Sequence, residues 1–272
     1  MTNLAEKRLF LFDIDGTLAV GDTLLPGARE LLAHIAAIGG RSLYITNNST
    51  KSRRDYVKKF ARWALETQPE DFVTASYAAC LHLREAYGDA LLFALGTASF
   101  AEELRAFGLN VTTRAERGVR AVIVGYDSEL TYDKVVDACR LLSDPSVAFE
   151  ATNPDLCCPI DFGFVPDCGA ICAMLTCAVQ RTPHYIGKPD PGIVRLCMDQ
   201  TCFSPGQTLV VGDRLYTDIA CGINAGVDTC LVLTGEAQRG DLAGTPYQPT
   251  FVFENAAALL DAVRSAGKGS PA

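Results

Sequence analysis

Two carboxylates, Asp13 and Asp15, stand one residue apart directly after the short apolar run Leu9 to Phe12. Two carboxylates this close repel each other unless a cation or a proton lies between them. Mg²⁺ prefers carboxylate and carbonyl oxygens, so it is the natural partner for such a pair. An arbitrary Asp-x-Asp pair more often begins a solvated loop, because short motifs match by chance. The apolar run before the pair and Gly16 after it favour a functional site here.

Further polar side chains repeat this pattern, in which an apolar run ends at residues able to bind an anion or a cation. Hydroxyl and amide groups at the end of a strand, next to the start of a helix, suit a phosphoryl group. Ordinary helix capping is the alternative explanation for the hydroxyl groups. The candidates are Thr46 and Asn47 after Ser42–Ile45, Asp213 after Thr208–Val211, Asp218 five residues later, and Lys188 in a Gly-Lys-Pro turn.

The elements that must position these residues alternate between short apolar strands and amphipathic helices. Such alternation predicts an α/β protein with a doubly wound parallel sheet. Ligands of open α/β sheets bind outside the carboxyl ends of the strands, where all of these candidates stand. We expect a catalytic core formed by residues 1–76 and 185–272, and a second small α/β unit formed by residues 77–184.

Length and charge limit the classes of function. The chain has 272 residues, which is enough to bury a core without disulfides or a structural metal. A formal net charge of −8 gives no electrostatic footprint for nucleic acid and disfavours an anionic membrane surface. A local cation still permits a small anionic substrate. The first eight residues lack the apolar core of a secretory signal, so we expect a cytoplasmic protein.

The eleven cysteines are scattered without a C-x-x-C pair, which indicates reduced thiols. Their spacing does not match the usual zinc patterns, although they are dense in one segment. Cys172 stands in an apolar helical run, where cysteine behaves as a small hydrophobic residue. Buried filler is therefore favoured over a metal cluster for the set Cys157, Cys158, Cys168, Cys172 and Cys177.

These side chains suit phosphoryl transfer. An ionised carboxylate is a competent nucleophile toward phosphorus when a cation relieves its repulsion by the substrate. Mg²⁺ and the ammonium of Lys188 would provide that relief. Catalysis then consists mostly of positioning and charge stabilisation. Asp15 could give a proton to the leaving group and later accept one from the attacking water.

Four segments of the chain resemble, in their order along the sequence, the four motifs of the haloacid dehalogenase superfamily. Thr46 follows Asp13 too closely for a domain between them, whereas the stretch from Thr46 to Lys188 has ample room for one. A large cap in that place resembles the NagD-like, para-nitrophenyl phosphatase branch. The segments are DIDGT (Asp13 to Thr17), the strand end ITNNS at Thr46, IGKP around Lys188, and VGDRLYTD (Val211 to Asp218).

The resemblance implies a role for each matching residue. Asp13 would be the nucleophile and Asp15 the general acid and base, while Thr46, Asn47 and Lys188 would hold the phosphoryl group. Magnesium would be bound by Asp13, the backbone carbonyl of Asp15, Asp213 and, through water, Asp218. Tyr216 departs from the family pattern, which often has an acid there. The cap would supply substrate contacts from Asn153 and Asp155, although an uninvolved turn explains either residue equally well.

The expected activity is Mg²⁺-dependent hydrolysis of small phosphomonoester metabolites through an aspartyl-phosphate. A phosphomutase or phosphotransferase of the same superfamily is an alternative, although its capped relatives usually carry the insertion after the first motif. A phosphoaspartate signalling module is another, but receiver domains are shorter and order their motifs differently. A binding protein that keeps only the fold is a third. The resemblance admits a homodimer formed through the cap, while the sequence itself shows no dimer face.

Overall fold

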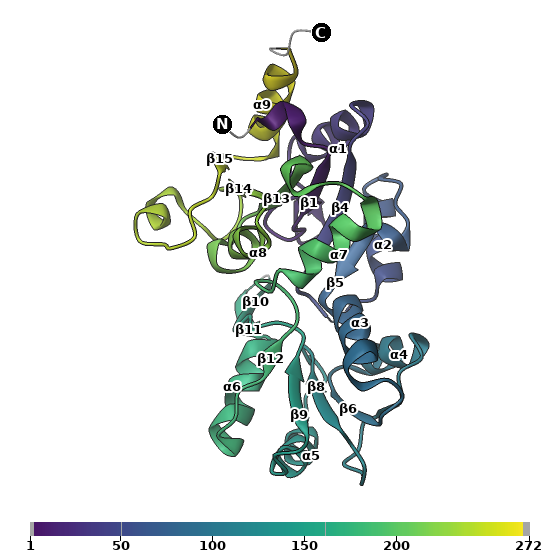
Figure 1. The fold of residues 1–272 in the computed structure, drawn as a ribbon. Helices are drawn as coiled ribbons and strands as arrows, with labels where there is room; N and C mark the ends of the chain where they lie inside the picture. Colours follow the sequence, from purple (N-terminus) through teal and green to yellow (C-terminus); the bar gives the residue numbers. More distant parts are fainter. Residues whose placement is uncertain (1–2, 50, 161, 269–272) are drawn as a thin grey trace. The chain divides into compact units, whose positions relative to one another are not determined.

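The chain forms two compact units in a computed structural model that describes residues 3–49, 51–160 and 162–268 (Figure 1). Unit 1 comprises Met1–Ile45, Val57–Val73 and Lys188–Ala272. Unit 2 comprises Thr46–Tyr56 and Thr74–Gly187. Residues 46–56, 74–76 and 185–187 are grouped with unit 2, although the expected boundaries place them in the core.

The centre of unit 1 is a sheet with the strand order β15-β14-β13-β1-β4-β5. All four residues of β1 are buried, as expected for a strand covered on both faces. This central strand pairs in parallel with β13 on one side and β4 on the other. The strands are β1 (Leu9–Phe12), β4 (Arg41–Thr46), β5 (Phe72–Thr74), β13 (Thr208–Gly212), β14 (Asp228–Val232) and β15 (Phe251–Phe253).

Helices cover both faces of this sheet. The connection from β1 through α1 leads toward one edge, and the connection from β13 through α8 leads toward the other. Because such crossovers are right-handed, α1 and α8 lie on opposite faces. Helix α9 packs on α1, and α7 packs on α8. The helices are α1 (Ala28–Ala37), α2 (Arg53–Arg62), α7 (Gly192–Thr201), α8 (Ala220–Ala225) and α9 (Ala256–Lys268).

Unit 2 is built on a second parallel sheet with the order β12-β9-β8-β6-β7. Its strands are β6 (Leu92–Leu95), β7 (Val111–Thr112), β8 (Ala121–Val124), β9 (Ala148–Ala151) and β12 (His184–Tyr185). Its helices are α3 (Ala75–Tyr87), α4 (Ala98–Ala106), α5 (Tyr132–Leu142) and α6 (Cys168–Val179).

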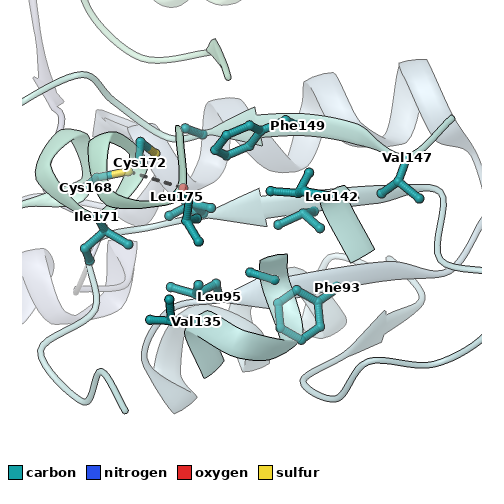
Figure 2. Close-up of a cluster of buried hydrophobic side chains, with 14 of the residues drawn as sticks. Phe93, Leu95, Val135, Leu142, Val147, Phe149, Cys168, Ile171, Cys172 and Leu175 are labelled. Atoms are coloured by element: carbon teal, nitrogen blue, oxygen red, sulfur yellow. Dashed lines mark hydrogen bonds between the residues drawn. The ribbon is translucent and has the colours of Figure 1, made fainter. Parts of the chain in front are cut away.

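Alternation along the central strands of unit 2 separates two apolar layers. Phe93 and Leu95 of β6 face α5 and α6, and Figure 2 shows this layer. Leu92 and Ala94 face α3 and α4. Cys172 is buried within the first layer, where it packs as a small apolar side chain. The period of two along each strand therefore decides which helix pair a residue meets.

Two short hairpins lie outside the two main sheets. The antiparallel pair β10 (Cys157–Ile160) and β11 (Gly163–Pro166) follows Asp155. The antiparallel pair β2 (Ala19–Val20) and β3 (Thr23–Leu24) follows Leu18. Both hairpins are too short to show a clear alternation of apolar and polar residues.

Short helical turns complete the chain, and they are Leu4–Glu6, Pro69–Asp71, Pro205–Gln207, Arg239–Ala243 and the π-helical turn Leu215–Ile219. Within the three described ranges, no helix combines the length and the apolar character needed to cross a membrane.

Candidate active site

The pairing of β1 with β13 brings two acidic segments of unit 1 together. Phe12 stands opposite Val211 in the parallel register, and the backbone N–H of Asp13 donates to the carbonyl of Val211 over 2.9 Å. Asp13 and Asp213 therefore leave neighbouring strands at the same edge of the sheet. In a parallel sheet this edge is where ligands bind.

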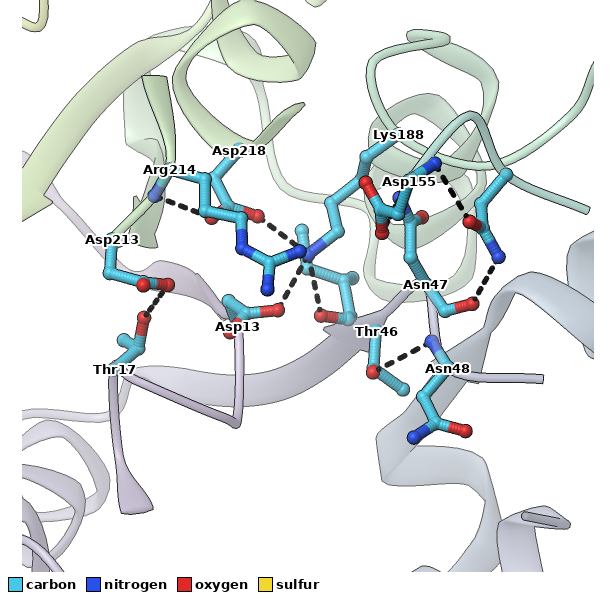
Figure 3. Close-up of polar contacts among 12 residues, drawn as sticks. Asp13, Thr17, Thr46, Asn47, Asn48, Asp155, Lys188, Asp213, Arg214 and Asp218 are labelled. Carbon is cyan, nitrogen blue, oxygen red and sulfur yellow. Dashed lines mark hydrogen bonds and ion pairs between the residues drawn. The ribbon is translucent and has the colours of Figure 1, made fainter. Parts of the chain in front are cut away.

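Lys188 joins this edge from the loop before α7. Its ammonium donates to Asp13 Oδ1 over 2.7 Å and to Asp218 Oδ1 over 2.6 Å. A third bond, of 3.2 Å, goes to the backbone carbonyl of Ile45 near the end of β4. Figure 3 shows the lysine between the two carboxylates. The side chain is buried, and these bonds direct its ammonium group into the cluster of carboxylates.

Asp218 is carried back toward the strand end by the π-helical turn Leu215–Ile219. The backbone N–H of Arg214 donates to Asp218 Oδ2 over 3.1 Å, so both carboxylate oxygens have partners. Such π-turns occur frequently at functional sites. Tyr216, in the same turn, is 44% exposed, and its hydroxyl lies 3.5 Å from Glu236 Oε2. Glu236 thus contacts the tyrosine that stands where the family often has an acid.

Asp213 is held by donors from two other loops. Thr17 Oγ1 donates to its Oδ1 over 3.3 Å, and the backbone N–H of Glu236 donates to its Oδ2 over 2.7 Å. Gly16 has a φ of +96°, and a Cβ placed on it would lie 2.5 Å from Asp213 Oδ2. A side chain at position 16 would therefore displace the carboxylate. The glycine of the Asp-x-Asp-Gly motif permits both the turn and the close approach.

Negative charge is in excess at this edge. Asp213 and Asp218 are buried and Asp13 is 13% exposed, while the described ion pairs to Asp13 and Asp218 both come from Lys188. Burial raises the pKa of Asp13 well above its ordinary value; Lys188 opposes this, and Asp218 and Asp213 add to it. Burial and, to a smaller extent, the negative charge of Asp218 raise the pKa of Asp213 to about 6. Burial is the largest cause of both shifts, and the neighbouring carboxylates add to it.

A divalent cation fits this excess of negative charge. One oxygen from each of Asp13, Asp213 and Asp218 lies within 4.8 Å of the others. Three carboxylates and one ammonium carry a net charge of about −2, which a single divalent ion neutralises. An all-oxygen donor set suits magnesium better than softer metals. The pKa of Lys188 lies above its ordinary value because Asp13 and Asp218 outweigh the opposing effect of burial, so this lysine is charged.

Asp15 is paired with a lysine that the sequence analysis did not identify. Lys59 Nζ, from the part of α2 in unit 1, lies 2.9 Å from Asp15 Oδ1. Lys59 is buried and also lies over the ring of Trp63, 5.2 Å from its centroid. The helical period places Lys59, and not Lys58, toward the apolar face of Tyr56 and Phe60, but it does not indicate Asp15 as the partner of the buried lysine.

The remaining predicted residues belong to unit 2, where they form a connected polar group. Asn47 Nδ2 donates to Asp155 Oδ2 over 3.1 Å, and Asn153 Nδ2 donates to the carbonyl of Asn47 over 2.8 Å. Asn153 Oδ1 accepts the backbone N–H of Asp155 over 3.0 Å. Thr46, the last residue of β4, accepts the N–H of Asn48 at its hydroxyl over 3.2 Å. Figure 3 shows Asn47 and Asp155 within this group.

Comparison with known proteins agrees with this geometry. The family of haloacid dehalogenase-like hydrolases matches residues 10–110, and a second family of HAD-like hydrolases matches residues 185–259. An acid sugar phosphatase of Staphylococcus haemolyticus is 32% identical over 246 residues, which cover 90% of this chain and 92% of that protein.

Solved structures extend the comparison. The 4-nitrophenylphosphatase of Thermotoga maritima is 35% identical with a TM-score of 0.90, covering 96% of this chain and 98% of its own. NagD of E. coli is 31% identical with a TM-score of 0.84, covering 92% and 97%. A glycerol phosphate phosphatase of Mycobacterium tuberculosis in complex with magnesium is 28% identical with a TM-score of 0.88, covering 97% and 78%.

The fold, the clustered carboxylates and these similarities define the class of protein. This chain belongs to the haloacid dehalogenase superfamily of hydrolases, with a doubly wound α/β core and a cap domain. Within that superfamily it falls in the NagD-like, p-nitrophenyl phosphatase branch, and it is a phosphatase.

Proposed function

We propose that this phosphatase hydrolyses small phosphomonoesters through an aspartyl-phosphate on Asp13 and depends on Mg²⁺. The observation that carries the proposal is the excess of carboxylate over ammonium around Asp13, Asp213 and Asp218. When bound, Mg²⁺ would neutralise this charge and keep Asp13 ionised as the dianionic phosphoryl group approaches. The magnesium complex of the glycerol phosphate phosphatase supports the choice of metal.

In the first step, a carboxylate oxygen of Asp13 attacks phosphorus and the bond from phosphorus to the alcohol oxygen breaks. Lys188 occupies Oδ1 of Asp13, which leaves Oδ2 as the attacking atom. Asp15 gives its proton to the departing alcohol. In the second step, water attacks phosphorus, Asp15 takes the proton of that water, and the bond to Asp13 breaks with release of inorganic phosphate.

Other residues are proposed to orient the substrate. Lys188, Thr46 and Asn47 would bind the phosphoryl group, and Asp15 would add its backbone carbonyl to the magnesium ligands. The backbone N–H of Arg214 fixes Asp218, so this carboxylate is a positioning group that reaches the metal through water. Unit 2 is proposed to be the cap, with Asn153 and Asp155 contacting the organic part of the substrate. Relatives named for sugar and glycerol phosphates favour a polyol or sugar phosphate.

The test is phosphate release from a panel of sugar, polyol and nitrophenyl phosphates, with and without MgCl₂. We expect turnover only with the metal, and a loss of at least about a thousandfold in Asp13→Asn, as found when a catalytic nucleophile is removed. Asp22→Asn is the matched control, because this aspartate is 78% exposed at its side chain and pairs with Arg62 on the surface. Near wild-type turnover in Asp13→Asn would refute the proposed nucleophile.

The homodimer and the cytoplasmic location stay predictions. Leu156, just before the hairpin β10–β11, and Phe162 and Phe164 within it are exposed on unit 2. Exposed apolar groups of this kind favour association. Light scattering on the wild type and on Phe164→Asp tests the dimer. We expect a dimeric mass that falls to the monomer value in the variant, and a monomeric wild type would exclude it.

A further inference from the structure

A buried glutamate stands on the strand next to the edge of the sheet of unit 2. Glu150, on β9, is opposite Ile123 of β8 and opposite His184 of β12 in the parallel register. Its neighbours in the strand, Phe149 and Ala151, point into the apolar layer on α5 and α6. By alternation Glu150 points to the other face, which α3 covers. A carboxylate in this place requires partners, because burying it alone is costly.

Three aromatic or imidazole side chains supply those partners. His184 Nδ1 lies 2.8 Å from Glu150 Oε2, and His82 Nε2, from α3, lies 3.5 Å from the same oxygen. The hydroxyl of Tyr87, also from α3, donates to Glu150 Oε1 over 2.5 Å. The two imidazole rings lie 5.1 Å apart at their centroids. Two of the three histidines of the whole chain thus meet at one carboxylate.

The carboxylate is held in its charged form. Burial raises the pKa of Glu150, but hydrogen bonds from His82, Tyr87 and His184 outweigh burial, and the pKa lies below its ordinary value. Tyr87 occupies one oxygen and leaves the other directed at the two histidines. Carboxylates that bind metal ions are commonly oriented by a hydrogen bond of this kind.

The separations are close to those of a metal centre. One ligand atom from each of His82, Glu150 and His184 lies within 4.8 Å of the others. Around a tetrahedral zinc ion, ligand atoms about 2.0–2.1 Å from the metal lie roughly 3.3 Å from each other. The 3.5 Å separation of His82 and Glu150 is near that value. The 2.8 Å separation of His184 and Glu150 would widen by about half an ångström as the metal replaces a proton.

We propose that His82, Glu150 and His184 form a binding site for a divalent transition metal of the zinc type, separate from the carboxylate cluster of unit 1. Two imidazoles and one carboxylate select zinc, copper or nickel over magnesium. His184 is 54% exposed and His82 is 32% exposed at their side chains, so an ion can enter from solvent. The bound ion would cross-link α3, β9 and β12, and its fourth ligand would be water.

The test uses untagged full-length protein that is stripped with a chelator, transferred to buffer with excess MgCl₂, and titrated with ZnCl₂ by calorimetry. The wild type is expected to bind one more zinc ion per chain than the double variant His82→Ala/His184→Ala. Tyr87→Phe is expected to bind that ion about 10- to 100-fold more weakly, because loss of an orienting hydrogen bond has this effect at metal sites. His34→Ala, on α1 of unit 1, is the matched control and should bind as the wild type does.

A readout on the unmodified protein separates loss of binding from loss of folding. The chain has three histidines, and their rings are expected to give three signals in a carbon–proton NMR spectrum. Zinc is expected to shift the signals of His82 and His184 and to leave the signal of His34 unchanged. In a separate measurement, Co²⁺ should give visible absorption without the near-ultraviolet bands of a thiolate complex. Equal zinc stoichiometry in the wild type and the double variant, an unchanged NMR spectrum, or thiolate bands would overturn the proposal. His82, Tyr87 and His184 would then serve only as hydrogen-bond partners of the buried Glu150.

Discussion

The two parallel sheets of this protein have the same architecture but differ in how charge is balanced at their strand ends. In unit 1, Asp13 and Asp213 directly follow β1 and β13, and Lys188 provides one ammonium for the carboxylates gathered there. In unit 2, the strand β8 is followed by Gly125 and Tyr126 and then by an aspartate. That aspartate, Asp127, is paired with Lys134 over 2.8 Å, so its charge is compensated.

This difference shows that the sheet alone does not make a catalytic site. Both sheets place polar residues at the carboxyl ends of buried strands, as doubly wound folds do. In unit 1, Asp13, Asp213 and Asp218 each bring one oxygen within 4.8 Å of the others, and the ammonium of Lys188 pairs with two of them, an arrangement that favours a bound cation. Function therefore depends on the groups carried by the fold and not on the fold itself.

The largest expected effect comes from removing charge in unit 1. Asp213→Asn keeps the shape of the side chain but removes one of three carboxylates, so Mg²⁺ should bind more weakly. We expect turnover at fixed MgCl₂ to fall by about a hundredfold or more, with partial recovery at high MgCl₂. Steady-state kinetics over a range of MgCl₂ measures this. Unchanged magnesium dependence would remove Asp213 from the metal site.

A smaller effect is expected at the lysine that pairs with Asp15. Lys59→Met keeps most of the apolar stem but removes the ammonium that lies 2.9 Å from the carboxylate. Turnover should fall by about tenfold, since a misplaced acid and base group transfers protons less efficiently, while the MgCl₂ dependence should not change. Lys58→Met, one residue away and exposed, is the control. Equal turnover in the two variants would show that Lys59 does not position Asp15.

The equivalent change in unit 2 should leave activity nearly intact. Asp127→Asn breaks the ion pair with Lys134 and weakens the bond that Asp127 Oδ1 accepts from the N–H of Glu129. We expect turnover within about twofold of the wild type, and a loss of about 1–3 kcal/mol in the free energy of unfolding. Denaturant melts and phosphate release measure the two quantities. A large loss of turnover at unchanged stability would contradict the contrast between the sheets.

Another carboxylate of unit 2 should affect stability through pH. Burial raises the pKa of Glu103 to about 7, against the opposing effect of Arg53. The folded state therefore binds this proton more tightly than the unfolded chain, whose pKa is about 4.3. The stability that this bound proton contributes is fully present below about pH 4.3 and is lost as pH rises through about 7. Relative to wild type, Glu103→Gln should gain on the order of 2 kcal/mol between pH 4.5 and pH 8, and a constant difference would contradict this.

Much of the core could be predicted because its signals are local. The apolar run before Asp13 and the run before Asp213 each indicate a buried strand that ends in an acid, and parallel sheets gather such ends. Lys188 could be included because it lies in a Gly-Lys-Pro turn at the start of the second segment of the core, residues 185–272.

Other features depend on contacts that no local pattern encodes. The helical period separates Lys59 from Lys58, but only the tertiary fold brings Lys59 to Asp15. The cluster at Glu150 requires the register between β9 and β12, which places His184 beside the glutamate. A glutamate between apolar residues in a strand was the available signal, and it indicates a buried charge without naming its partners.

The most direct test of the central claim is a crystal structure with Mg²⁺ and beryllium trifluoride, which mimics a phosphoryl group attached to an aspartate. We predict a bond from beryllium to an oxygen of Asp13, one Mg²⁺ held by Asp13 and Asp213, and Lys188 in contact with the fluorides. A beryllium trifluoride group bound to another residue, or a metal ion away from these carboxylates, would contradict the account.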